Sequence, residues 1–295
     1  MFKNLSLEAL GVCGTQNETI ELALSHGFRG IDLDIKDFSQ QAAERGLPHA
    51  RRLLDSAKLK IGGFALPVDW LAEDAGKADM ARLPELAKLA ADLGCTRALA
   101  QIAPGSDELP FHQNFELHRK RFADIATVLE PFGIRLGVGF NATPEAGAGK
   151  HYQFIQKFDQ VLMLLGLVGK RNVGVLLDIW HLHVVGNGIS DLAKLSKDQI
   201  VAVRVADFPP DIGRENASET NRLLPGETGV IDIPAWLTWL ADLGYDGPVT
   251  PYPDKSYFQN VRRDEIGKRV GQATDRVWKA AGLSATGKRP AVASL

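Results

Sequence analysis

The sequence predicts an α/β protein built as a closed (β/α)₈ barrel, and three observations lead to this fold. The chain has 295 residues, a length typical of one large barrel domain. Short apolar or β-branched runs alternate with segments of helical periodicity, as in successive strand–helix units. There are eight such runs, the number that closes a barrel, at residues 5–12, 28–35, 59–66, 95–102, 134–141, 172–179, 200–207 and 247–253.

Two of the intervening segments carry clear helix-end signals. In "NETIELALSHG", Asn17 is the expected N-cap and Gly27 the stop. In "IDIPAWLTWLADLGYDG", Asp232 is the expected N-cap, Pro234 lies in the first turn and Gly244 ends the helix. Both segments therefore read as helices that lead into a strand.

The chain shows no internal domain boundary, so a single domain is predicted over residues 1–282. Residues 283–295 are rich in small residues and lack periodicity, which predicts a loose C-terminal tail. A doubly wound sheet is the alternative fold, because it also alternates strands and helices. The stretch "GVCGTQ" after the first run lacks the GxGxxG spacing and the Lys-Ser/Thr pair of phosphate loops, which argues against a nucleotide site there.

Composition restricts the partners and the compartment. The net charge is −2 and no long Lys/Arg block occurs, so no nucleic-acid partner is expected. The longest apolar run, residues 161–169, is too short to cross a bilayer, and the N-terminus lacks the features of an export signal. Cys13 and Cys95 form no CxxC pattern, which argues against a disulfide framework or a thiolate zinc site. A cytoplasmic protein without membrane contact is therefore expected.

Polar side chains at the strand ends are the candidates for function, because chemistry in these barrels takes place at the carboxyl ends of the strands. The valines of "VAVRVAD" share one face, so period-two alternation turns Arg204 toward the barrel interior. The same rule turns Asp178 and Tyr252 inward, and Asp34 and Gln101 end two further runs. The predicted mouth thus mixes carboxylates, an amide, a phenol and a guanidinium.

Each candidate also has a purely structural interpretation. Asp178 could form an ion pair with Arg204 on the neighbouring strand, Asp34 could cap a helix, and Gln101 could bind loop amides. Among the histidines, His181 stands out because it lies three residues beyond Asp178, just past a strand end. The others, apart from His183, fall in predicted helices or loops, where a solvated or capping histidine is the ordinary outcome.

Five longer motifs add a resemblance to a known family: "GFALPVDW" (63–70), "PGSDELPFHQNFELHR" (104–119), "VGVLLDIWH" (173–181), "RLLPGETGVID" (222–232) and "GYDGPVTP" (244–251). Over nearly the whole chain the sequence resembles the sugar phosphate isomerase/epimerase family, the xylose isomerase-like TIM barrels. Active members of that family hold a divalent ion with Glu, Asp, His and Glu on strands five to eight. The ion polarises the sugar carbonyl and hydroxyl, and a proton moves between adjacent carbons. The related AP-endonuclease barrels need a histidine-rich metal cluster and a basic DNA surface, and the sequence shows neither.

The resemblance implies that most of this metal site is lost. The four ligand positions fall on Gly139, Asp178, Arg204 and Tyr252, so that Asp178 alone is kept. Glycine offers no side chain, tyrosine is normally protonated at neutral pH, and arginine is a permanent cation. No metal and no other cofactor is therefore expected.

Further residues that the resemblance places near a ligand are present, namely His181 and Arg222, together with Asp207 at the end of strand seven. The predicted site has two groups: His181, Asp178, Arg204 and Tyr252 for catalysis, and Arg222, Asp207, Gln101 and Asp34 for ligand binding. The expected ligand is a sugar-like or polyol-like small molecule, with any proton transfer independent of metal. The alternative is a non-catalytic sugar-binding or regulatory protein, and a homo-oligomer stays open.

Overall fold

Eight parallel strands close into a barrel in the computed structural model, which describes residues 1–289 except for the side chain of residue 53. Around the barrel the strands follow the order β1-β10-β9-β8-β6-β4-β3-β2. Their bounds are β1 Phe2–Leu5, β2 Gly30–Leu33, β3 Lys60–Ala65, β4 Arg97–Gln101, β6 Arg135–Gly139, β8 Val173–Asp178, β9 Ile200–Val205 and β10 Pro248–Pro251. The predicted (β/α)₈ barrel is confirmed.

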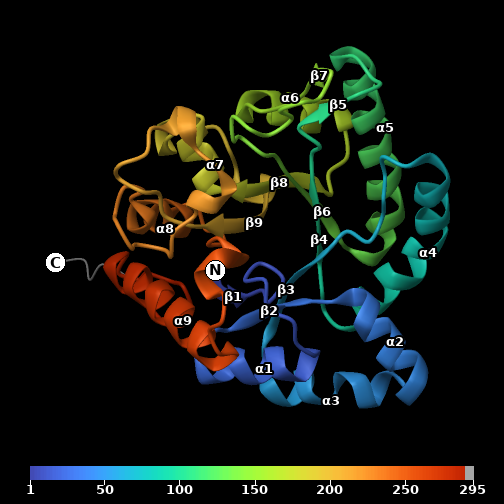
Figure 1. The fold of residues 1–295 in the computed structure, drawn as a ribbon. Helices are drawn as coiled ribbons and strands as arrows, with labels where there is room; N and C mark the ends of the chain where they lie inside the picture. The colour runs from blue at the N-terminus through green and yellow to red at the C-terminus, as the bar shows by residue number, and fades with distance from the viewer. Residues whose placement is uncertain (290–295) are drawn as a thin grey trace.

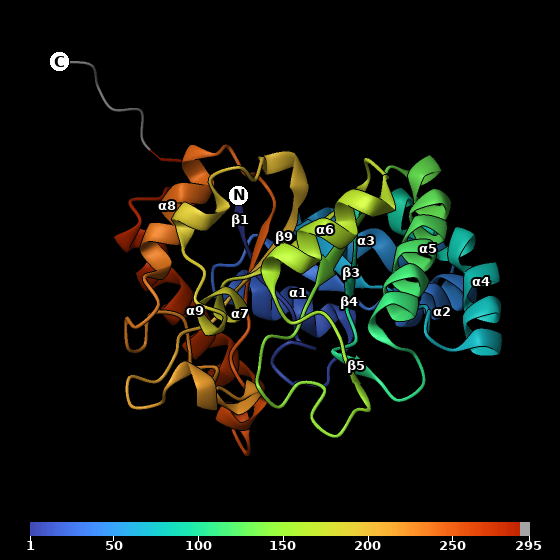
Figure 2. The same cartoon turned by 90° about the horizontal axis from the view of Figure 1, so that it is seen from above.

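Helices form the outer layer around the strands (Figure 1), and the view from above shows the same ring from another side (Figure 2). They are α1 Gln16–Ser25, α2 Ile35–Arg45, α3 Leu47–Ala57, α4 Glu73–Asp92, α5 Phe111–Leu129, α6 Phe158–Val168, α7 Ile179–Val184, α8 Ile233–Asp242 and α9 Arg263–Ala280. Two short strands, β5 Gly105–Ser106 and β7 Tyr152–Gln153, pair antiparallel outside the barrel. Short 3-10 turns are η1 Glu130–Phe132, η2 Ile189–Leu192, η3 Lys197–Gln199, η4 Arg214–Asn216, η5 Glu219–Asn221 and η6 Lys255–Phe258. The last helix, α9, packs beside α1 and α8 and closes the ring.

Seven of the eight predicted runs contain their strand, and the first run is wrong. The first strand is β1, which ends at Leu5, where the predicted run of residues 5–12 begins. Leu7 and Leu10 are buried, but the backbone around them turns, with the Leu10 N–H donating to the Leu7 carbonyl. These residues are apolar because their side chains reach the hydrophobic core from a turn, and their pattern imitates a strand.

One predicted helix end is correct and the other is shifted. Asp232 caps α8 by accepting from the Ala235 N–H at 3.0 Å, as predicted. The N-cap of α1 is Thr15, two residues before the expected cap Asn17, because Thr15 and Glu18 form a reciprocal capping box. The motif Thr-x-x-Glu was present in the sequence.

Part of the predicted loose tail lies against the barrel. Leu283 is buried, and the Trp278 indole N–H donates to the Ser284 carbonyl at 2.9 Å. Arg289 pairs with Asp242 at 2.8 Å. Residues 290–295, the rest of that predicted segment, lie outside the described residues.

Within residues 1–289, no helix has both the length and the apolar character needed to cross a bilayer. The two cysteines in this part of the chain are free thiols, Cys13 at the surface and Cys95 in the interior.

Two arginines lie at the amino-terminal end of the barrel and bind backbone carbonyls there. Arg97 donates to the Val201 carbonyl at 3.0 Å, and Arg135 donates to the Ile200 carbonyl at 3.3 Å. Both carbonyls belong to the first residues of β9. The guanidinium groups of Arg97 and Arg135 are thus bound to the backbone of β9.

Candidate active site

Strand register brings three inward-facing side chains into one row near the carboxyl end of the barrel. Asp178 on β8 lies opposite Arg204 on β9, and Arg204 lies opposite Thr250 on β10. The predicted adjacency of Asp178 and Arg204 is therefore correct. Their side chains nevertheless take different partners.

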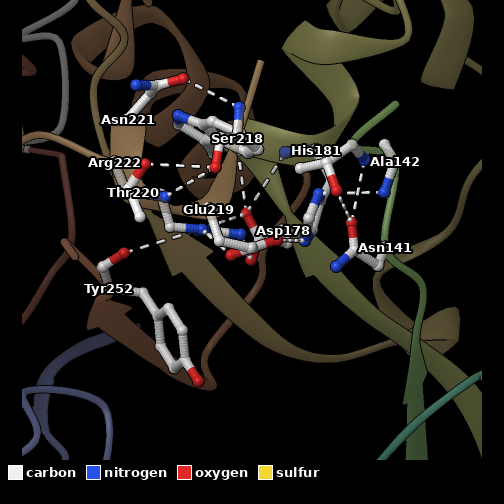
Figure 3. A network of polar contacts seen from close by, with 12 residues as sticks. Asn141, Ala142, Asp178, His181, Ser218, Glu219, Thr220, Asn221, Arg222 and Tyr252 are labelled. Atoms are coloured by element: carbon white, nitrogen blue, oxygen red, sulfur yellow. Dashed lines mark hydrogen bonds and ion pairs between the residues drawn. The ribbon is translucent and has the colours of Figure 1, made fainter. Parts of the chain in front are cut away.

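Asp178 is paired with Arg222, which reaches it from the loop after β9. Two nitrogens of Arg222 bind the two carboxylate oxygens, at 2.8 and 3.3 Å (Figure 3). Asp178 is 3% exposed and Arg222 is 2% exposed, so this ion pair is fully buried. Burial opposes ionisation of Asp178, but the charge of Arg222, supported by that of Arg204, outweighs it and lowers the pKa of Asp178.

Three further groups contact the Arg222 guanidinium besides Asp178. Its Nε donates to Glu219 Oε2 at 2.7 Å, and its Nη1 lies 3.4 Å from the Tyr252 carbonyl oxygen. The guanidinium also lies 4.6 Å from the centre of the Trp180 ring. Burial would lower the pKa of Arg222, but Asp178 and Glu219 raise it above its usual value. Arg222 is therefore a fixed cation within the wall of the mouth.

His181 is neutral, and its contacts define which nitrogen carries the proton. The Ala142 backbone N–H donates to Nδ1 at 3.2 Å, so Nδ1 accepts and the proton lies on Nε2. Nε2 lies 3.2 Å from Glu219 Oε1 (Figure 3). Burial lowers the pKa of His181 to about 3, against the opposing charge of Asp178. Glu219 thus accepts from the charged Arg222 and lies beside the neutral His181 ring.

Asp178 and His181, predicted for catalysis, lie behind the surface of the mouth. His181 is 1% exposed and both of its nitrogens have partners. Asp178 also accepts backbone N–H groups from Trp180 and His181 as the N-cap of α7. These two residues fix neighbouring groups in place and leave little room for a ligand to touch them.

The predicted ion pair between Arg204 and Asp178 is wrong. In the described part of the chain Arg204 has no ion pair, and its guanidinium stacks on the Tyr252 ring at 4.1 Å from the ring centre. Arg222 already occupies both oxygens of Asp178, which leaves Arg204 to turn toward the ring. Arg204 and Tyr252 are both half-buried, so they line the mouth.

Gln101 is at the mouth, as predicted, and is exposed at the end of β4. Its Nε2 donates to the Phe140 carbonyl at 3.3 Å. A Cβ added to Gly139 would clash with the Gln101 side-chain oxygen. The amide of Gln101 therefore fills the space beside Gly139, one of the four positions where the resemblance implies a metal ligand.

Asp207, predicted to bind the ligand, is instead fully buried, and its carboxylate is bound by backbone N–H groups. Its carboxylate accepts four N–H groups at 2.7–3.0 Å, from Phe208, Thr228, Gly229 and Ile231. The backbone of Asp207 also pairs with Leu223. This residue shapes the loop that carries Glu219 and Arg222, and it does not face the mouth.

Asp34, also predicted to bind the ligand, is an exposed N-cap of α2 and accepts from the Lys36 and Asp37 N–H groups. The strand ends one residue earlier, at Leu33, and the inward-facing carboxylate is Asp32. Sequence reasoning missed Asp32, although Asp32 and Asp34 are two residues apart and would point to the same face of a strand. The Asn4 amide donates to it at 2.8 Å.

The family now follows from the sequence itself. The family profile described as xylose isomerase-like TIM barrel matches residues 20–266. The chain belongs to this family. The predicted family resemblance is therefore confirmed.

Individual relatives of this xylose isomerase-like barrel are more distant. The inosose isomerase of Bacillus licheniformis is 28% identical over 157 residues, 52% of each chain, so the match spans about half of that relative. A xylose isomerase domain protein from Alicyclobacillus acidocaldarius has a TM-score of 0.84 at 24% identity, covering 95% of this chain and 98% of the other. D-psicose 3-epimerase from Clostridium cellulolyticum, solved with D-tagatose, has a TM-score of 0.71 at 14% identity, covering 95% and 99%. The two structural matches establish the fold.

The residues of this xylose isomerase-like barrel do not fit the four-ligand metal site that the resemblance implies. Asp178, the kept ligand, has both oxygens paired with Arg222. The other positions carry no side chain at Gly139, a cation at Arg204 and a phenol at Tyr252. Within residues 1–289, no three His, Cys, Asp or Glu side chains are grouped so that they could hold a metal ion.

Proposed function

We propose that this chain binds a sugar-like or polyol-like small molecule at the carboxyl end of the barrel and moves a proton between its carbons without a metal ion. The observation that carries the proposal is the guanidinium of Arg204, stacked on Tyr252 at the mouth and not paired with any carboxylate in residues 1–289. It stands at a position where active relatives are expected to hold a ligand of the ion.

Arg204 supplies the charge that such a reaction needs. Removal of a proton beside a carbonyl leaves negative charge on the carbonyl oxygen, and a fixed cation stabilises that charge. Two unit charges about 4 Å apart attract by about 4 kcal/mol at an effective dielectric near 20, which corresponds to about three orders of magnitude in rate. Stacking on Tyr252 holds the guanidinium in place without using its N–H groups.

The buried network behind the mouth supports this role by supplying a rigid wall. Arg222 binds both Asp178 and Glu219, and Glu219 also lies beside the His181 ring, so these four side chains hold one another in place. The sugar-rearranging names of the relatives, inosose isomerase and D-psicose 3-epimerase, agree with a carbonyl substrate. For this chain we propose the same class of substrate, a polyhydroxy ketone or aldehyde.

The test is proton exchange in the presence of a chelator. The protein, dialysed against EDTA and checked by elemental analysis, is incubated in D₂O with D-tagatose, D-fructose or an inosose, and deuterium at carbon is followed by NMR. We expect exchange that EDTA leaves unchanged and that Arg204→Gln slows by about 100-fold or more. Exchange that requires added Mn²⁺, or one divalent ion retained per chain, would contradict the metal-free proposal.

A non-catalytic sugar-binding protein is the second candidate. It is favoured by the burial of Asp178 and His181, because two residues expected to carry acid–base chemistry are closed off by their own partners. The same incubation separates the two functions. A sugar that shifts the melting temperature and is recovered without deuterium or rearrangement indicates a binder.

A further inference from the structure

Asp32 is an inward-facing carboxylate that the mechanism has not used so far. It lies on β2, and the side-chain amide of Asn4 on β1 donates to it at 2.8 Å. The same amide donates to Thr250 on β10 at 3.0 Å, so that three neighbouring strands fix its position. A Cβ on Gly62 of β3 would run into Asp32 and Asn4. The Asp32 carboxylate therefore lies beside β1 and β3, and Asp32 is half-buried.

We propose that Asp32 is the proton acceptor of this site, acting together with Arg204. The inference rests on the proposed function, because it assigns the base that metal-free proton transfer requires. It adds a catalytic residue that lies on strand two, away from the strands that carry the family's metal ligands.

The other carboxylates near the mouth are already engaged. Asp178 is paired with Arg222, and so is one oxygen of Glu219, while the other oxygen of Glu219 lies 3.2 Å from His181 Nε2. Asp207 accepts four backbone N–H groups. Asp32 has no ion pair in the described part of the chain, and its partners are neutral side chains. It is the carboxylate best able to take a proton.

The surroundings of Asp32 suit a base near neutral pH. Burial raises the pKa of Asp32 to about 6, although hydrogen bonds from Asn4 and Ser6 and the charge of Arg204 oppose the rise. Glu8 in the loop after β1 also raises the pKa of Asp32. Burial, with a further contribution from Asp32, raises the pKa of the nearby Cys95 thiol before β4. Asp32 is thus ionised at pH 7.5 and more basic than an ordinary aspartate.

The reaction balances without a further reactant. Asp32 removes the proton from the carbon beside the carbonyl, the C–H electron pair forms a C=C bond, and the carbonyl pair moves onto the oxygen near Arg204. The proton then returns from Asp32 to the neighbouring carbon, while the hydroxyl proton passes to the first oxygen. The product is an isomer of the substrate, and Asp32 is restored.

The experiment compares Asp32→Asn with Asp34→Asn, a matched change two residues away at an exposed helix cap. Deuterium incorporation into D-tagatose, D-fructose and an inosose is measured from pH 4.5 to 8.5, and binding of the same sugars is measured by calorimetry. We expect wild type to lose exchange as the pH falls through about 6. Asp32→Asn should lose about 100-fold or more with binding retained, and Asp34→Asn should match wild type.

The outcomes separate the two proposals. Exchange by wild type that persists in Asp32→Asn, with the same pH profile, overturns the role of Asp32 and leaves the proposed function standing. Absence of exchange in wild type with every sugar overturns the proposed function and the role of Asp32 together. Carbon-detected NMR of labelled aspartate supplies a second readout. The carboxyl signal that disappears in Asp32→Asn belongs to Asp32 and should titrate near pH 6. Its titration midpoint should move to higher pH in Arg204→Gln, because the charge of Arg204 lowers the pKa of Asp32. A midpoint near pH 4 contradicts the inference.

Discussion

The buried pair of Asp178 and Arg222 makes a strong prediction about stability. Replacing Arg222 by methionine keeps much of the side-chain volume but leaves the Asp178 carboxylate with only the backbone N–H groups of Trp180 and His181. Removing one partner of a buried ion pair costs about 3–5 kcal/mol. With an unfolding entropy of about 2.1 cal/mol/K per residue, 295 residues give about 0.6 kcal/mol/K. We therefore expect the melting temperature to fall by roughly 5–8 °C.

Arg204→Met is the matched control, because it removes an arginine from the same mouth that has no ion pair in residues 1–289. We expect this variant to lose no more than about 1 kcal/mol of unfolding free energy. Urea unfolding and calorimetry at pH 7.5 measure both variants. Equal losses for Arg222→Met and Arg204→Met would refute the assignment of Arg222 as the partner of Asp178.

Two further measurements test the electrostatic reason. Adding Asp178→Asn to Arg222→Met removes the uncompensated charge, so the double variant should be more stable than Arg222→Met alone. Because the folded state lowers the pKa of Asp178, the stabilisation is present above the pKa of the unfolded chain and is lost as the pH falls. The gap between wild type and Arg222→Met should therefore narrow in acid. A gap that is constant from pH 7 to pH 3 contradicts the argument.

Three other changes give separate predictions. The folded state lowers the pKa of His181 to about 3, so the unfolding free energy of wild type should fall as the pH is lowered from 6.5. In His181→Gln, urea unfolding should show a smaller decrease over the same pH range. Asp207→Ala leaves four backbone N–H groups without their acceptor, so we expect the unfolding free energy to fall by about 3 kcal/mol. Proteolysis between residues 208 and 232 should become faster, and unchanged proteolysis would contradict the role given to Asp207. Gly139→Ala should displace the exposed end of Gln101 and change the unfolding free energy by less than about 1 kcal/mol, and a larger loss would show that Gln101 has no room to move.

The barrel could be predicted from the sequence because strand periodicity and helix ends are local signals. The same signals placed Arg204 correctly beside Asp178, since register follows from strand alternation. They failed at the amino terminus, where Leu7 and Leu10 are apolar for a different reason: they lie in a turn whose side chains join the core. A short strand before that turn gives little pattern, which is why β1 was placed too late.

The side-chain partners in the site could not be predicted in the same way. Arg222 lies on an irregular loop 44 residues beyond Asp178, and its path is set by the buried carboxylate of Asp207. Glu219 carries no local pattern that would mark it as the link between Arg222 and His181. Whether Asp32 or Asp34 is the inward-facing carboxylate depends on where β2 ends. Sequence patterns do not define a strand end to within one residue.

The network in Figure 3 also has a kinetic consequence. It ties together backbone that follows four strands, through Ala142 after β6, His181 after β8, Glu219 after β9 and the Tyr252 carbonyl after β10. These connections form when the chain folds, so the entropy of ordering this wall is already lost before any ligand arrives. A small molecule should then enter in a single step whose observed rate rises linearly with its concentration, without the plateau that a closing loop would impose.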